Sequence, residues 1–226
     1  MPPPKNIRFV VWTAETISQE LLQHCAELFS ENYGVWSEKG LRPGDRIRIS
    51  AARLKIDYLF NPKFCSLITA ELYPNKDLIG HAFVCTFPFL NGYAVWISQL
   101  VVREDMRRRG VATELICKSW TRDVVAWGLA TSNPYSIRAL ERASQRRCDP
   151  EAISKHAKDL VSASGIPAFQ NCKLSIDSEK SLIHCDFFVD HTNVNKAIAA
   201  EQNWTLGLLD EGDEFLAFCF TVENCS

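Results

Sequence analysis

Residues 95–115 read VWISQLVVREDMRRRGVATEL. The first eight residues are an apolar, β-branched run, which predicts a buried strand. A charged turn with Gly110 follows, and an amphipathic helix begins after it. Because the first N–H groups of a helix have no intrahelical partner and carry partial positive charge, this order predicts an anion site. Glycine lets the backbone approach a ligand and arginine binds phosphate, so we expect a pyrophosphate-bearing ligand held mainly by backbone.

Two other nucleotide-binding motifs do not fit this turn. A P-loop requires Gly-Lys-Ser/Thr after its glycines, and no such tripeptide follows Gly110. A dinucleotide fingerprint requires three spaced glycines, and only one is present. A basic helix start that simply faces solvent stays open as the structural alternative.

The composition is that of an ordinary globular protein, with 46% hydrophobic and 23% charged residues in a chain of 226. This length suits one domain with elaborations. The net charge of -2 gives no basic field for nucleic acid, so we expect no nucleic-acid partner. The N-terminus lacks an apolar signal core and no apolar run is long enough to span a membrane. We therefore expect no membrane partner and a cytoplasmic or nuclear location.

Nine cysteines are scattered along the chain without a Cys-x-x-Cys pair. Without a signal peptide, this odd number predicts reduced, mostly buried thiols. The neighbours His184 and Cys185 cannot easily aim at one ion, so we expect no metal site.

Hydrophobic periodicity predicts a mixed order of strands and helices. A polar, partly helical segment, 147–180, interrupts this order of strands and helices and is interpreted as an insertion on the rim. In the helix after Gly110, we expect Leu115, Ile116 and Trp120 to be core residues. The expected strands are 7–13 (closed by Thr13 as a helix cap), 64–73, 78–87, the strand before Gly110, 128–132, 183–189 and 214–222. The expected helices are 15–33, a basic helix from 45 or 50 to 59, 111–126, one opening at Asn133-Pro134, and 193–202.

The pattern Arg107-x-x-Gly110-x-Ala112 after a Leu-Val-Val strand resembles the acetyl-CoA signature of the GNAT superfamily of N-acetyltransferases. The resemblance covers residues 7–146 well and the remainder loosely. It implies an α+β, three-layer fold, with a mixed, mostly antiparallel twisted sheet, helices on both faces and a splayed central strand pair. We expect a single domain over residues 1–226, with the insertion at 147–180, as a monomer or homodimer.

In this superfamily the signature strand pairs with the pantetheine arm of acetyl-CoA, and the turn amides hold its pyrophosphate. The resemblance therefore implies acetyl-CoA as acyl donor. Asn133 matches an asparagine that often contacts the cofactor arm, although Asn before Pro is also a common helix cap. The implied cofactor-binding residues are Leu100, Val101, Val102, Arg107, Arg108, Arg109, Gly110, Val111, Ala112, Thr113 and Asn133.

The catalytic groups depart from the family pattern twice. Many members carry a carboxylate or tyrosine on the substrate face of the signature strand, where alternation places Trp96 and Ser98. Many also have a tyrosine on the helix after Asn133, where this chain has Leu140. The candidate catalytic residues are then Ser98, which could orient a water, and two residues of the preceding hairpin, His81 and Glu71. Asp190 and His191, after a C-terminal strand, are further candidates of the same kind.

The acceptor pocket of the superfamily lies between the first two helices and the C-terminal strands. Tyr33 and Trp36 belong to that wall and are candidate substrate-binding residues, although Trp36 could equally plug the helix junction. The resemblance implies transfer of an acetyl group to a primary amine by direct attack, with a small-molecule amine favoured. Three alternatives stay open: a protein or peptide N-acetyltransferase, a catalytically weak acyl-CoA-binding module, and a nucleic-acid-binding module using the Arg107 cluster.

Overall fold

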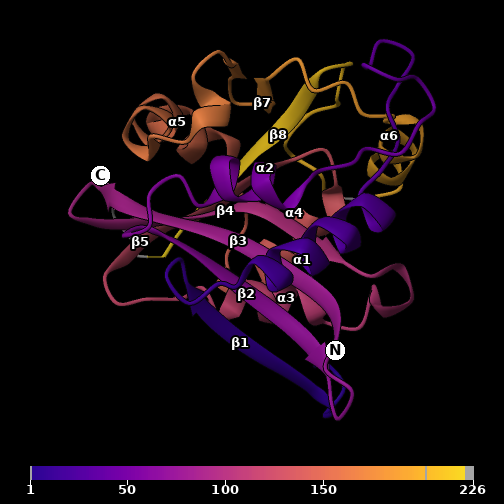
Figure 1. The fold of residues 1–226 in the computed structure, drawn as a ribbon. Helices are drawn as coiled ribbons and strands as arrows, with labels where there is room; N and C mark the ends of the chain where they lie inside the picture. The colour runs from indigo at the N-terminus through magenta and orange to yellow at the C-terminus, as the bar shows by residue number, and fades with distance from the viewer. Residues whose placement is uncertain (1, 202, 222–226) are drawn as a thin grey trace.

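The computed structural model describes residues 2–201 and 203–221. One twisted sheet of eight strands runs through the molecule and carries helices on both faces (Figure 1). The strands are β1 (Ile7–Thr13), β2 (Cys65–Leu72), β3 (Asp77–Phe89), β4 (Gly92–Val102), β5 (Val124–Thr131), β6 (Lys173–Ile176), β7 (Ser181–His184) and β8 (Asp213–Phe220). Their order in the sheet is β1-β2-β3-β4-β5-β8-β7-β6, and only the β4–β5 pair is parallel. The predicted fold class, mixed and mostly antiparallel, is confirmed.

Within residues 2–201 and 203–221, six α-helices and two short 3₁₀ turns form the outer layers. The helices are α1 (Gln19–Asn32), α2 (Ala51–Tyr58), α3 (Val111–Cys117), α4 (Pro134–Ser144), α5 (Pro150–Ser164) and α6 (Thr192–Ala199), and the 3₁₀ turns are η1 (Glu104–Met106) and η2 (Pro167–Phe169). On one face of the sheet, Tyr58 of α2 stacks on Phe83 of β3 with ring centroids 5.4 Å apart. We call this the α1–α2 face. Helix α5 lies on the same face, where the ring centroids of His156 and Phe220 are 5.0 Å apart. Helices α3 and α4 cover the opposite face (Figure 1).

The predicted boundaries of two helices are wrong. Helix α1 is capped by Ser18, whose hydroxyl accepts from the Leu21 amide, and not by Thr13. Helix α3 ends at Cys117 instead of continuing to 126, because the chain turns back at Asp123 and its next, continuously apolar residues enter the sheet as β5. Trp120 consequently lies in the turn and is 51% exposed, whereas Leu115 and Ile116 are buried as predicted.

The segment 147–180 packs into the main core and not on the rim. Helix α5 has Pro at its first turn and an Asp149 cap, and it buries Ile153, Ala157 and Leu160 in the main core. Phe169 of η2 meets Trp96 of β4 edge to face at 5.5 Å. The segment therefore supplies a third helix to the α1–α2 face. None of the described helices is long and apolar enough to cross a membrane.

A one-residue bulge in β4 changes which side chains face which layer. Cys85 pairs with Trp96 and Phe83 pairs with Gln99, so the bulge at Ser98 interrupts the alternation. Cys85 and Phe83 are two residues apart and share a face, and therefore Trp96 and Gln99 share it too. The pairing gives the face of Gln99 but not that of the extra residue Ser98, so the predicted face of Ser98 stays a prediction.

The central strands β4 and β5 diverge at the same point. Their parallel pairing runs from Tyr93 to Ile97 on β4 and stops there, while β4 stays paired with β3 as far as Val102. On the other side, β5 stays paired with β8 as far as Thr131. The predicted splayed central pair is therefore present, and it opens in the middle of the sheet.

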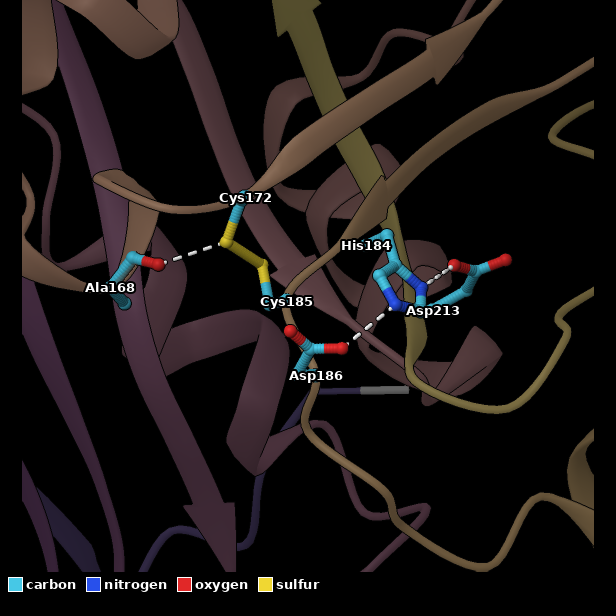
Figure 2. The surroundings of a disulfide bond; sticks show 6 residues. All are labelled: Ala168, Cys172, His184, Cys185, Asp186 and Asp213. Carbon is cyan, nitrogen blue, oxygen red and sulfur yellow. Dashed lines mark hydrogen bonds and ion pairs between the residues drawn. A yellow bond between two sulfur atoms is a disulfide. The ribbon is translucent and has the colours of Figure 1, made fainter. Parts of the chain in front are cut away.

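A disulfide joins Cys172 and Cys185, which flank the β6–β7 hairpin, with Cα atoms 4.6 Å apart (Figure 2). The prediction that all cysteines are reduced is wrong for this pair, because the hairpin brings together two residues that look unrelated in the sequence. Beside the disulfide, His184 lies between Asp213, at 2.7 Å, and Asp186, at 3.0 Å. These carboxylates, Asp213 first, raise the pKa of His184.

We predict that the disulfide stabilises the fold by constraining the unfolded chain. Closing a loop of this length removes unfolded-state entropy worth about 2–3 kcal/mol. Replacing Cys172 by serine should therefore lower the free energy of unfolding in urea by about that amount. The wild type in excess reductant should behave like the variant, and Cys117→Ser should match the untreated wild type. A urea midpoint unaffected by reductant would contradict the prediction.

Candidate functional site

The turn between β4 and α3 has the geometry of an anion-binding loop. Gly110 is the N-cap of α3 in the left-handed region, with φ 78°, and Arg108 also has a positive φ of 60°. The first amide to donate to a carbonyl of the new helix is that of Glu114, to Gly110 at 3.0 Å. In the described parts of the chain, the amides from Arg108 to Thr113 have no backbone acceptor. This run of free donors, at the positive end of a helix, is suited to a phosphate group.

The three arginines of the loop have different surroundings. Arg107 donates from Nε to the Val102 carbonyl at 3.1 Å and from Nη2 to the Asn32 carbonyl at the end of α1. The Asn32 side chain in turn accepts from the Glu104 amide at 2.9 Å. Arg107 therefore fixes the loop to β4 and α1, while the exposed Arg108 and Arg109 are the cations left to meet a phosphate.

The end of β4 offers an unpaired backbone edge next to this loop. Leu100, Val101 and Val102 lie beyond Ile97, where the pairing with β5 stops. An extended ligand can add to such an edge by main-chain hydrogen bonds. The predicted cofactor residues of β4 and of the loop thus lie along one continuous path, although their contacts with a ligand remain a prediction.

Asn133 is a helix cap, which is the alternative to a role in cofactor binding. Its side chain caps α4 by accepting from the Tyr135 amide at 3.0 Å. It lies two residues after Thr131, the end of β5, and β5 borders the divergence. Its role in cofactor binding stays a prediction.

A carboxyl group that sequence reasoning missed lies on the α1–α2 face. Glu214 lies four residues before Phe218, and alternation along β8 puts both on that face, where Phe218 contacts Phe220 at 5.5 Å. The Glu214 side chain keeps partial contact with solvent, yet its surroundings remove enough water to raise its pKa from 4.5 to about 7. The neighbouring Phe215 pairs with Thr131, the last paired residue of β5, so Glu214 lies just beyond the divergence.

Two tyrosines share the environment of Glu214. Burial, and then the charge of Glu214, raise the pKa of Tyr33 well above 10. Burial raises the pKa of Tyr58 to about 12, and Glu214 adds to this increase. Glu214 is therefore near enough to both phenols for its charge to act on them.

Two loop segments meet at Tyr33, and we call them together the clamp: residues 33–47 and 187–190. Phe187 contacts Trp36 edge to face at 5.4 Å and Tyr33 at 6.1 Å, so three aromatic rings lie together where the segments meet. The sequence prediction paired Tyr33 with Trp36 but missed Phe187. Two backbone hydrogen bonds join the segments, from Ser37 to Phe188 (3.0 Å) and from Asp190 to Val35 (3.1 Å), and two more fold the first segment on itself, from Ile47 to Gly34 (2.9 Å) and from Trp36 to Asp45 (3.0 Å).

The three predicted catalytic residues lie in three different environments. Ser98 is at the bulge, and its hydroxyl is buried without a partner among the described residues. His81 is fully buried on β3, and desolvation lowers its pKa to about 4, so it is neutral at pH 7 and a weak base. Glu71 accepts from Thr69 at 3.2 Å and lines a hollow of about 340 Å³ between β1 and α1. Since β2 and β8 are separated by three strands, Glu71 is far from Glu214.

The described residues contain no group of three or more His, Cys, Asp or Glu side chains arranged to hold a metal ion.

The comparison with protein families identifies the chain. The Acetyltransferase (GNAT) family profile matches residues 22–144, more than half of the sequence. The chain therefore belongs to the GNAT acetyltransferase family, which confirms the resemblance seen in the loop sequence. A comparison with curated protein sequences gives no match.

Solved structures with a similar fold are acetyltransferases of low sequence identity. NAA60 of Arabidopsis thaliana, bound to a bisubstrate analogue, is 13% identical, with 95% of this chain and 97% of that chain covered and a TM-score of 0.48. An aminoglycoside acetyltransferase from an uncultured soil metagenomic sample, in complex with sisomicin, is 15% identical over 50% and 67% of the chains, with a TM-score of 0.36. A ribosomal-protein-alanine N-acetyltransferase from Brucella melitensis biovar Abortus 2308 is 16% identical over 49% and 67%, with a TM-score of 0.33.

We predict that a side chain at position 110 abolishes acetyl-CoA binding and leaves the fold intact. Gly110→Leu puts a bulky group beside the free amides of the loop, in a left-handed conformation that disfavours leucine. Calorimetric titration with acetyl-CoA measures the binding, and circular dichroism checks the fold. Gly165→Leu is the matched control, because Gly165 also has a positive φ (58°) but caps α5, with no atom within 4 Å of an added Cβ. Normal binding by Gly110→Leu would show that the loop is not the cofactor site.

Proposed function

We propose that the protein transfers the acetyl group of acetyl-CoA to the primary amine of a small molecule, with Glu214 as general base. The observation that carries the proposal is a carboxyl group with a pKa of about 7, beside the point where β4 and β5 diverge. A base with a pKa near the working pH combines a substantial ionised fraction with enough basicity to take a proton. Membership of the GNAT family supplies the reaction class.

The donor is proposed to bind along the path described above. The amides from Arg108 to Thr113 would hold the pyrophosphate, with Arg108 and Arg109 adding charge. The pantetheine arm would pair with the free edge at Leu100 to Val102. This arrangement brings the thioester to the divergence, near the α1–α2 face and Glu214.

The reaction follows from these positions. An ammonium group must first lose a proton, and the Glu214 carboxylate accepts it, directly or through one water. The amine lone pair then attacks the thioester carbonyl carbon, while a backbone N–H near Leu100 stabilises the developing oxyanion. The C–S bond breaks, its electron pair goes to sulfur, and the thiolate takes the second proton of the nitrogen. Holding both reactants at one place supplies much of the rate enhancement.

The clamp supports a small acceptor. Its two segments are hydrogen-bonded to each other, and the Phe187 ring packs against both Tyr33 and Trp36. An extended peptide would have to separate these segments to reach Glu214, whereas a slender amine would not. A peptide or protein N-terminus is therefore the second candidate acceptor.

A binding module without catalysis is the alternative from a different class. Trp96 is buried against Phe169, and Leu140 is fully buried, so neither position that often carries a catalytic group in the family offers one here. If acetyl-CoA binds but no amine accelerates CoA release, this alternative holds and the proposed transfer is wrong.

We predict that the rate depends on the ionisation of Glu214. With a panel of small primary amines and short peptides, CoA release should be fastest with a small amine, and its kcat/KM should rise with pH through about 7 and then level. Glu214→Gln should lower kcat by roughly 10²–10⁴-fold and remove this rise. Glu71→Gln is the matched control, since it removes a carboxylate three strands away, and it should leave the profile unchanged. Retention of the wild-type profile in Glu214→Gln would rule out this base.

A further inference from the structure

Gln99 is a polar residue of the α1–α2 face at the divergence. The bulge at Ser98 brings Gln99 onto the face of Trp96, and β4 no longer pairs with β5 at this residue. Gln99 is only 5% exposed, so its amide is withdrawn from water. Leu100, the next residue, begins the free edge of β4.

The orientation of the Gln99 amide is fixed by His81. The two side chains meet at 2.8 Å between His81 Nε2 and Gln99 Oε1. Because the amide oxygen can only accept, Nε2 of the neutral imidazole carries the hydrogen and donates it. Ring contact with Phe83, at 5.5 Å between centroids, helps to hold the imidazole in place. The amide nitrogen of Gln99 must then point away from His81.

This amide nitrogen is a buried donor without a hydrogen-bond acceptor in the part of the chain that the structure describes. Tyr58 is a polar neighbour, close enough for Gln99 to lower the pKa of the phenol against the larger effect of burial, yet no hydrogen bond of good geometry joins them. Buried donors are rarely left unpaired, because the loss of water is then uncompensated. An acceptor atom supplied by a ligand would remove this cost.

We propose that the Gln99 side-chain amide donates a hydrogen bond to the carbonyl oxygen of the bound acyl thioester, and that His81 is the positioning residue that orients this amide. The inference rests on the proposed function, since it requires the thioester to lie at the divergence. The carbonyl oxygen gains negative charge during amine attack, and a fixed donor pointed at it stabilises that charge more than the ground state. Gln99 would thus add a side-chain donor to the backbone N–H near Leu100.

The test uses full-length protein and acetyl-CoA labelled with ¹³C at the carbonyl carbon. In the wild type, the infrared carbonyl stretch of the bound thioester should lie at lower frequency than in solution. Gln99→Met keeps the length of the side chain and removes the donor, so the stretch should return toward the solution value. His81→Phe keeps Gln99 but removes the hydrogen bond that orients its amide, so the carbonyl stretch should move in the same direction by a smaller amount. Gln170→Leu, at an exposed position, is the control and should behave as wild type.

Kinetics with the best amine of the panel give a second readout. Gln99→Met should lower kcat by about 10²-fold, the usual cost of losing one oxyanion donor, and change the KM for acetyl-CoA little. An unchanged carbonyl stretch in a Gln99→Met protein that still binds acetyl-CoA would overturn the inference and leave the proposed function standing. Failure of the wild type to bind acetyl-CoA would overturn both. If Gln99→Met does not fold, the carbonyl stretch of acetyl-CoA bound to His81→Phe is the test. A stretch at the wild-type frequency in that variant would overturn the role of His81.

Discussion

The divergence of β4 and β5 is the constraint on which the rest of the structure depends. Two parallel strands in the middle of a sheet would normally stay paired along their length, because unpaired backbone groups are costly to bury. Here the pairing stops at Ile97, next to a bulge of one residue at Ser98. The loop of free amides before Val111 lies at the same end of β4. The sheet thus gives up a few hydrogen bonds at its centre and gains a place for an extended ligand.

The C-terminal part of the chain completes this arrangement. Strand β8 continues the sheet beyond β5 and places Glu214 on the face that α1 and α2 cover. The segment after the β6–β7 hairpin runs back to the loop between α1 and α2, and the Cys172–Cys185 disulfide fixes the start of that segment (Figure 2). Residues far apart in the sequence therefore share one small region around a single carboxyl group.

The sequence predicted the parts of this region that are local. The strand, the glycine-bearing turn and the helix after it follow from adjacent residues, and so does the Asn133 cap of α4. The face of Gln99 could not be predicted, because the bulge at Ser98 is set by pairing with β3. Glu214 follows Asp213 after a polar turn and looks like a surface residue until the sheet order places it beside β5. One signal was available, since Glu214 has the spacing of the buried face of its own strand.

The open edge in the sheet has a consequence for the amount of the protein in a cell. A ligand that pairs with Leu100 to Val102 acts as a missing strand, and binding to the folded state alone raises the free energy of unfolding with ligand concentration. If the proposed acyl donor is that ligand, its supply would govern how often the chain opens to proteases, in addition to how fast it turns over substrate. The lifetime of the protein would then be linked to the metabolic state that provides its donor.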